Sequence, residues 1–100
     1  MRQPPGTFST FWLYTIRIDE SKAKLGSRQL MKALDAVGVQ TRPLWQPMHL
    51  SPAHKGAFST DCSVAEKLNR QALSVPCSVG LSNGEQQKVI GMIVRASTQM

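Results

Sequence analysis

The sequence predicts an α+β fold in which three helices pack on a small, three-stranded, mainly antiparallel sheet, a two-layer arrangement. The hydrophobic pattern changes period along the chain in the order strand, helix, strand, long loop, helix, strand, helix. With 41% hydrophobic and 18% charged residues, the chain has the composition of a globular protein. Its length suits one domain, and no apolar run approaches the roughly 20 residues of a membrane span.

The first strand is predicted over residues 11–18, after a lead-in or linker at residues 1–10 that is rich in Pro, Gly, Thr and Ser. A single small domain is therefore expected over residues 11–100. Aromatic and β-branched residues favour a strand, and their alternation places one set on a single face: Trp12, Tyr14, Ile16 and Ile18. The other face also begins apolar, which predicts that the strand is covered on both sides near its start.

The clearest helix is predicted from Ser27 to Val37. Ser27 is a suitable N-cap, and Gly38 suits the left-handed position just after the helix. Apolar residues at helical spacing form the expected buried stripe: Leu30, Met31, Leu34 and Val37.

Two further helices are predicted from capping-box patterns, Ser63-Val-Ala-Glu66 and Ser82-Asn-Gly-Glu85. The first helix is expected to run to about Gln71 and the second to about Ser97. Asp61 is a competing N-cap for the first. The side chains expected to face inward are Val64, Ala65 and Leu68 in the first helix, and Val89, Ile90, Ile93 and Val94 in the second.

Two short strands complete the predicted sheet, at residues 39–42 and 73–77. Each is followed or interrupted by a proline, Pro43 in one case and Pro76 in the other. Because proline has no N–H to donate to a neighbouring strand, each strand is expected to be short or to lie at an edge.

Residues 44–60 show neither helical nor strand periodicity, and an aperiodic stretch of this length is usually functional or disordered. The apolar residues within it favour a packed loop: Trp45, Met48, Leu50 and Phe58. The segment from Gly38 to Leu50 concentrates three residue types that serve binding sites. Arg42 offers a planar donor fork for phosphate or carboxylate, Trp45 an apolar wall, and His49 a donor or proton carrier.

Residue types alone leave a structural role open for the same three residues. Trp45 could anchor the loop to the core, Arg42 could be a solvated strand end, and His49 could bond to backbone. Other sites find less support. The possible metal ligands are spaced unlike a zinc site, namely His49, His54, Cys62 and Cys77. No Gly-rich phosphate loop is present, and the two cysteines are expected to be free thiols.

The order and spacing of several segments resemble a known family: residues 11–16, 27–34, 38–50 and 72–78, followed by an apolar helix. This pattern resembles the C-terminal, small domain of the pyridoxal-phosphate-dependent nucleotide-sugar aminotransferases of fold type I. The resemblance covers about residues 8–97. It implies a part in converting keto-sugars to amino-sugars, usually for surface polysaccharides or glycosylated products.

The resemblance also implies what this chain lacks. In the family, pyridoxal phosphate (PLP) is held by a large N-terminal domain with a Schiff-base lysine. None of the lysines here fits that motif: Lys22, Lys24, Lys32, Lys55, Lys67 and Lys88. The chain is therefore expected to bind no cofactor alone and to be a catalytically incomplete fragment, truncated product or free-standing remnant. The resemblance makes Arg42, Trp45 and His49 candidate substrate-binding residues, although many family members have tyrosine where Trp45 stands.

Alternative functions follow from the charge of +6, which suits an anionic partner. One alternative is a module for single-stranded nucleic acid that uses Trp12, Tyr14 and Trp45 for stacking, although no nucleic-acid motif is recognised. Another is an adaptor that docks on an aminotransferase subunit. We also expect an exposed apolar patch through which the chain docks to the large domain or associates with itself. No membrane partner and a cytoplasmic location are expected.

Overall fold

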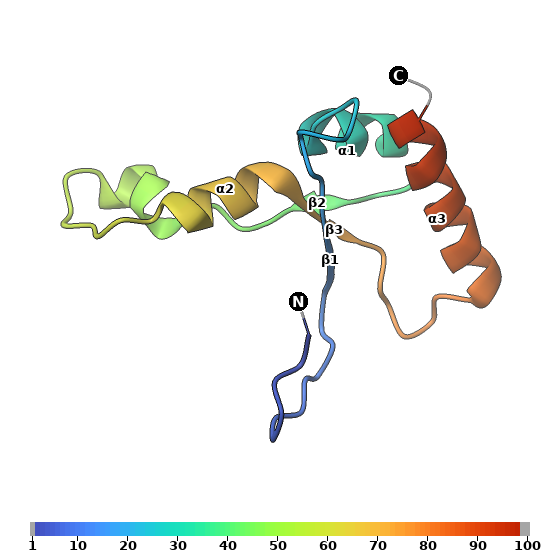
Figure 1. The fold of residues 1–100 in the computed structure, drawn as a ribbon, viewed down its shortest axis with the longest axis horizontal. Coiled ribbons are helices and arrows are strands. Elements are labelled where there is room, and N and C mark those ends of the chain that lie inside the picture. Colours follow the sequence, from blue (N-terminus) through green and yellow to red (C-terminus); the bar gives the residue numbers. More distant parts are fainter. Residues whose placement is uncertain (1, 99–100) are drawn as a thin grey trace.

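The computed structural model of the chain describes residues 2–98, and its elements follow the predicted order (Figure 1). The strands and helices are β1 (Tyr14–Arg17), α1 (Ser27–Asp35), β2 (Arg42–Pro43), α2 (Ser63–Gln71), β3 (Ala72–Val75) and α3 (Asn83–Thr98). Two 3₁₀ turns, η1 (Met48–Leu50) and η2 (Pro52–His54), lie in the loop that was predicted to be aperiodic. The α+β prediction is confirmed.

The sheet has the order β1-β3-β2, and both pairs of strands are antiparallel. Tyr14 lies opposite Val75 and Arg17 opposite Ala72, so β1 pairs along the whole of β3. The edge position predicted for the strand before Pro43 is confirmed. Of the two alternatives predicted for the strand before Pro76, the structure shows the short strand and not the edge position, because the four-residue β3 ends at Val75 and can therefore pair on both sides.

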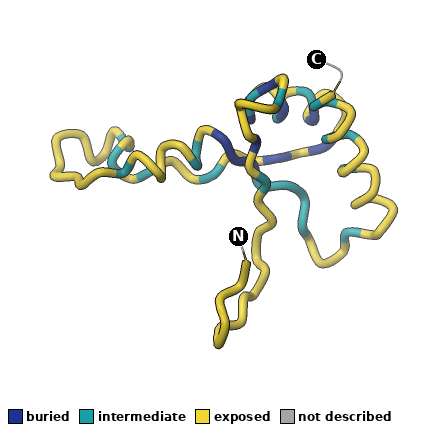
Figure 2. Tube along the Cα trace, viewed as in Figure 1, coloured by how far each residue is buried: buried dark blue, intermediate teal, exposed yellow. Residues whose placement is uncertain are grey.

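The core lies where α1 meets the sheet, as the dark blue segments of Figure 2 show. Leu30 and Leu34 of α1 and Leu73 of β3 are at most 1% exposed. Full burial of a leucine side chain contributes about 1.5–3 kcal/mol. Three further buried side chains complete this cluster: Ile18, Leu25 and Val39. The predicted stripe of α1 is therefore correct except at Val37, which is 48% exposed because the helix ends at Asp35.

Helix α3 packs beside α1 and covers the core with one face, formed by Val89, Met92, Ile93 and Ala96. The prediction that Ile90 and Val94 face inward is wrong, because they are 45% and 55% exposed. These two residues lie on the adjoining face of the helix. Among residues 2–98, no helix is both long enough and apolar enough to cross a membrane.

Residues 44–71, here called the arm, project from the core (Figure 1). They comprise η1, η2, the loop to residue 62, and α2. The prediction that Val64 and Ala65 are buried is wrong: Val64 is 69% exposed, and Ala65 is also exposed. The predicted packing of the loop is also wrong for Trp45, Met48, Leu50 and Phe58, which are 47–94% exposed. No other segment among residues 2–98 covers these exposed apolar side chains of the arm.

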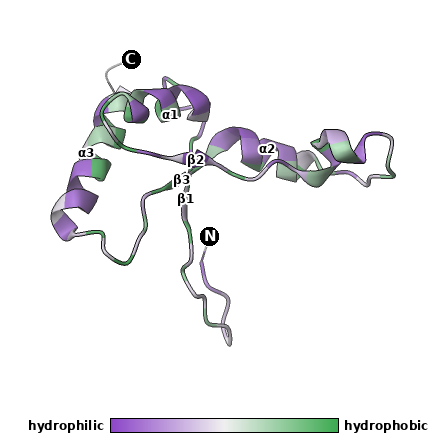
Figure 3. Ribbon diagram, turned by 180° about the vertical axis from the view of Figure 1, so that it is seen from behind, coloured by the Kyte–Doolittle hydropathy of each residue, from purple (hydrophilic) through white to green (hydrophobic). Residues whose placement is uncertain are grey.

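The N-terminal segment, residues 2–13, also extends away from the core (Figure 1). Its apolar side chains are exposed, including Phe8, Phe11, Trp12 and Leu13, so the predicted covering of both faces at the start of β1 is not present. Figure 3 shows hydrophobic and hydrophilic residues together on these projecting segments. The accessible surface is 8094 Å², against roughly 5,600 Å² for a compact chain of this mass.

The helix N-termini differ in how they are capped. Gly26, not Ser27, is the N-cap of α1, and Gln29 accepts a hydrogen bond from its backbone N–H. Ser82 and Glu85 form the predicted capping box of α3, with reciprocal bonds of 2.8 and 3.2 Å. The backbone N–H of Ser82, followed by its side chain, lowers the pKa of Glu85. The box predicted for α2 is absent; Asp61 accepts from the Ser63 N–H instead, which lowers the pKa of Asp61.

Candidate functional site

The segment from Gly38 to Leu50 leaves α1, crosses the edge of the sheet and enters the arm. Gly38 has a φ of +80°, a conformation that favours glycine, and this reverses the chain after the helix. Val39 and Thr41 then turn into the core. Arg42 is exposed in β2 opposite Ser74, and no ion pair of Arg42 is found within the part of the chain that the structure describes.

Trp45 lies against Trp12 of the N-terminal segment. The ring centroids are 5.7 Å apart with an interplanar angle of 56°, although the residues are 33 positions apart in sequence. Both remain accessible, at 78% for Trp45 and 68% for Trp12. Two exposed indoles in contact form an aromatic surface on which a planar or ring-shaped ligand can stack. Trp45 therefore does not anchor the loop in the core.

His49 lies in η1 and is held by helix α2. Its Nε2 is 2.7 Å from Oε1 of Glu66, and its side chain is 19% exposed. A histidine with one nitrogen bonded to a carboxylate has a fixed ring orientation, and the second nitrogen is left for another partner. The alternative that His49 bonds to backbone is therefore not what the structure shows.

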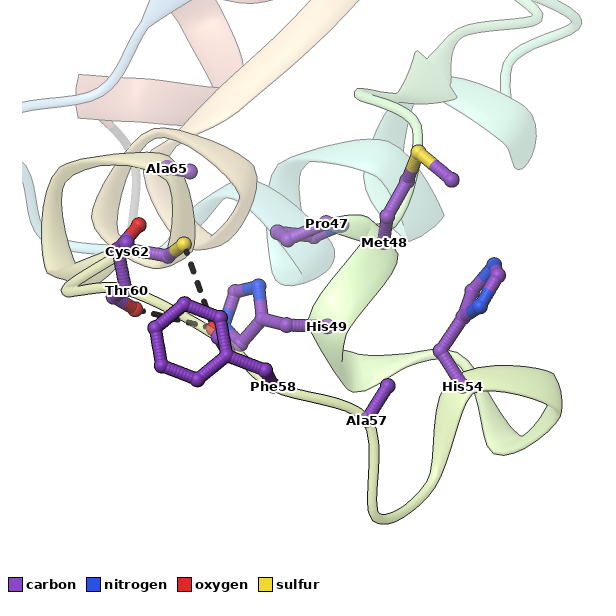
Figure 4. Close-up of a pocket in the computed structure, with 10 residues that line it drawn as sticks. Pro47, Met48, His49, His54, Ala57, Phe58, Thr60, Cys62 and Ala65 are labelled. Carbon is purple, nitrogen blue, oxygen red and sulfur yellow. Dashed lines mark hydrogen bonds between the residues drawn. The ribbon is translucent and has the colours of Figure 1, made fainter.

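A cavity of about 480 Å³ opens beside His49 in the arm (Figure 4). Its lining combines apolar side chains with two imidazoles, a thiol and two hydroxyls: Pro47, Met48, His49, His54, Ala57, Phe58, Ser59, Thr60, Cys62 and Ala65. Cys62 is 3.8 Å from the Ser59 hydroxyl. Arg42 and Trp45 do not line this cavity, so the three predicted site residues do not converge on one pocket.

A second cavity, of about 510 Å³, lies between α3 and the β1–β3 side of the sheet. Its lining is mainly apolar and includes Tyr14, Ile16, Pro76, Ile90 and Val94. The exposed faces of α3 and β1 thus border the same groove. Cys77 also lines it, and its thiol points to the Trp12 carbonyl at 3.5 Å.

Other chemistry finds little support in the structure. Cys62 and Cys77 are free thiols, as predicted. Among residues 2–98, no three His, Cys, Asp or Glu side chains are grouped so that they could hold a metal ion. All six lysines are exposed, and neither of the two cavities is lined by a lysine.

Sequence reasoning missed three residues that contact the candidate segment. Trp12 was assigned to a strand face and to stacking in the nucleic-acid alternative, but not to a contact with Trp45, and Glu66 was assigned to a capping box. Asn69 was not singled out, although its amide reaches the carbonyls of Leu44 and Trp45. The Ser-x-x-Glu pattern was a misleading signal for Glu66, and no sequence signal pairs it with a histidine 17 residues earlier.

Comparison by sequence and by structure finds aminotransferases among the relatives of this chain. The chain is 32% identical over 83 residues to GDP-perosamine synthase from Caulobacter vibrioides, which covers 83% of the chain and 22% of that protein. In structure it resembles the aminotransferase TlmJ from Streptoalloteichus hindustanus, with a TM-score of 0.81, 25% identity, and coverage of 96% of the chain and 25% of TlmJ.

A Brucella abortus aminotransferase gives a similar result, with a TM-score of 0.78, 28% identity, and coverage of 97% of the chain and 25% of that protein. The chain thus spans about a quarter of the length of these relatives. Residues 1–94 match the sequence profile of one family. The chain belongs to the DegT/DnrJ/EryC1/StrS aminotransferase family.

Proposed function

We propose that this chain is the small, C-terminal part of a PLP-dependent aminotransferase that acts on nucleotide-linked keto-sugars, and that it is catalytically incomplete alone. Family membership carries the proposal. The name of one relative, GDP-perosamine synthase, supports the nucleotide-sugar substrate. The cytoplasmic location expected from the sequence remains a prediction.

The shape of the chain supports a part that packs against a larger body. Its radius of gyration is 15.7 Å, against about 13 Å for a compact domain of 100 residues. Large apolar side chains are exposed along β1, α3 and the arm, including Tyr14, Val64 and Val94. Contiguous exposed apolar surface is typical of an interaction site. We assign this surface to the large domain of a family member or to a second copy of the chain.

PLP belongs to the family but does not fit the described residues of this chain. A Schiff-base site needs a lysine in a cleft beside the cofactor. All six lysines are exposed here, and none lines a cavity described above. We therefore derive no step through PLP from this chain and assign it a substrate-side role.

In that role the segment from Arg42 to His49 forms one wall of the substrate site. The exposed guanidinium of Arg42 is available for a phosphate or a sugar hydroxyl. The indole of Trp45, supported by Trp12, offers a face against which a sugar or base ring can pack. The second nitrogen of His49 is available for a sugar hydroxyl.

An exchange of segments tests this function. The chain replaces the matched 83-residue segment of Caulobacter GDP-perosamine synthase, and formation of GDP-perosamine is measured together with PLP absorbance. The expected result is a chimera that holds PLP and forms the amino-sugar.

The matched control is the same exchange with the corresponding segment of Bacillus subtilis EpsN, which is 27% identical to this chain. If the EpsN chimera is active while the chimera with this chain holds PLP but forms no product, the proposed function is wrong.

The exposed pair Trp12–Trp45 also favours a second candidate, a module for single-stranded nucleic acid. That function requires affinity that falls as salt rises. The unmodified chain and a Trp12→Ala variant are titrated with a fluorescent oligonucleotide at low and high salt. Salt-dependent binding that Trp12→Ala removes would support this candidate over the aminotransferase role.

A further inference from the structure

Two side chains of α2, one helical turn apart, contact the candidate substrate segment. Glu66 and Asn69 are spaced i, i+3 and therefore share a face of the helix. Glu66 bonds to the His49 ring, and the Asn69 amide donates to the carbonyls of Leu44 and Trp45, which lie in the peptides before and after Trp45. The segment is thus held at both ends by one helix.

The contact of Glu66 determines which His49 nitrogen is available. A carboxylate oxygen accepts, so the His49 Nε2 at 2.7 Å carries the proton and donates a hydrogen bond to Glu66. In the neutral imidazole, Nδ1 is then an acceptor. The ring is therefore arranged to receive a hydrogen bond from a hydroxyl donor at Nδ1, which suits a sugar better than a phosphate oxygen.

The amide of Asn69 has only one orientation that satisfies its neighbours. Its Nδ2 is 2.8 Å from the Leu44 carbonyl oxygen and 3.2 Å from that of Trp45, and both can only accept. Its Oδ1 faces Nη2 of Arg28 in α1 at 3.4 Å, which can only donate. A flipped amide would place like groups together on both sides.

Arg28 also donates to the Asn69 carbonyl at 3.2 Å, so the end of α2 is tied to α1 of the core. The backbone at Trp45 is consequently connected to the core through Asn69 and Arg28. This connection does not require that the Trp45 ring be buried. It explains how an indole that is 78% exposed can still occupy a defined place.

We propose that Glu66 and Asn69 are positioning residues for the substrate wall: Asn69 fixes the backbone that carries Trp45, and Glu66 fixes the His49 ring with Nδ1 free to accept from a sugar hydroxyl. The meaning of this wall rests on the function proposed above. The positioning itself is a property of this chain and is testable without any substrate or cofactor.

The test for Glu66 uses nuclear magnetic resonance of the full chain. The wild type is expected to show the His49 Nε2–H proton in slow exchange with water. Glu66→Ala removes the acceptor and is expected to lose this signal. Glu66→Gln keeps an oxygen acceptor at the same place and is expected to retain it.

The test for Asn69 measures amide hydrogen exchange of residues 44–50. Asn69→Ala removes two hydrogen bonds, and exchange is expected to rise about tenfold. Asn69→Asp places a carboxylate against two carbonyl oxygens, and its effect is expected to be larger. Lys67→Ala, at an exposed position of the same helix, is the matched control and is expected to leave exchange unchanged.

Two results would overturn the proposal. One is an unchanged His49 Nε2–H signal in Glu66→Ala together with unchanged exchange in both Asn69 variants. The other is a rise in exchange that is equal in residues 44–50, α1 and β3, because Asn69 would then support the whole fold. The expected losses in these variants, combined with an inactive chimera, would remove the aminotransferase assignment and leave the positioning standing.

Discussion

The core around Leu30, Leu34 and Leu73 and the arm of residues 44–71 differ in what their side chains contact. In the core, leucines that are at most 1% exposed pack together between α1 and the sheet. In the arm, apolar side chains such as Val64 and Phe58 are exposed, and polar bonds through Glu66 and Asn69 hold the segment. The comparison teaches that the candidate wall is held in place by hydrogen bonds rather than by burial.

The largest expected effect is in the core. Leu73→Ala removes a side chain that is 0% exposed, and such changes destabilise by 2–5 kcal/mol. We expect a loss of about 3 kcal/mol in the free energy of unfolding, measured by urea denaturation.

The matched change in the arm is Val64→Ala, at a position that is 69% exposed. Its expected effect is within about 0.5 kcal/mol, since exposed side chains contribute little. Equal losses for the two variants would show that the arm is packed as tightly as the core, and the contrast drawn above would fail.

An intermediate effect is expected where the arm joins the core. Ser27 is buried in α1, and its hydroxyl donates to the carbonyl of Arg70 at the end of α2 at 2.5 Å. Ser27→Ala leaves that carbonyl without this donor, and the expected loss in unfolding free energy is about 1–2 kcal/mol.

Ser78→Ala, at an exposed loop position, is the control for Ser27→Ala and should be neutral. Ser27→Ala should also speed amide exchange in α2 more than in β3, because β3 keeps its pairing with β1. An effect of Ser27→Ala as small as that of Ser78→Ala would mean that the buried bond does not tie the arm to the core.

A smaller effect than that of Ser27→Ala is expected at the start of α3. Ser82→Ala removes the hydroxyl that accepts from the Glu85 N–H and should cost about 1 kcal/mol near pH 7. The backbone N–H of Ser82, which donates to the Glu85 carboxylate, and secondly the Ser82 side chain lower the pKa of Glu85 in the folded chain. Their contribution is therefore present above the pKa of the unfolded chain and is lost as pH falls through the folded value.

Glu85→Ala removes the carboxylate that accepts from the Ser82 N–H, so the stability difference between wild type and Glu85→Ala should shrink as the pH is lowered from 7 toward 3, measured by urea denaturation at each pH. Gln87→Ala, at an exposed position later in the same helix, is the control. A difference that stays constant over this range would show that Glu85 takes no part in the cap.

The regular elements could be predicted because each depends on local chemistry. Gly38 takes the positive φ expected just after α1, and Ser82 with Glu85 caps the start of α3, as their residue types indicate. Whether Val64, Ile90 and Val94 are buried or exposed could not be predicted in the same way, and all three are exposed. An apolar face shows that a surface favours a cover, but its spacing does not say whether the cover lies in the same chain.

The sequence could nominate candidate site residues, but it could not predict their arrangement. Arg42, Trp45 and His49 stood out by type within one segment, whereas their partners lie far away in sequence. Trp12 contacts Trp45 from the N-terminal segment, and Glu66 bonds to His49 from α2. Glu66 also fitted a capping box, and a local pattern cannot decide between a local and a distant partner.

The central claim is that residues 42–49 form the substrate wall of a sugar aminotransferase. The measurement that tests it most directly is kcat/KM for the nucleotide-sugar in the GDP-perosamine synthase chimera, with Arg42→Ala, Trp45→Ala or His49→Ala. Each variant is expected to lower kcat/KM at least about tenfold, which is the loss of about 1.4 kcal/mol of transition-state binding, with PLP absorbance unchanged. Equal kcat/KM in all three variants and the unmodified chimera would contradict the claim.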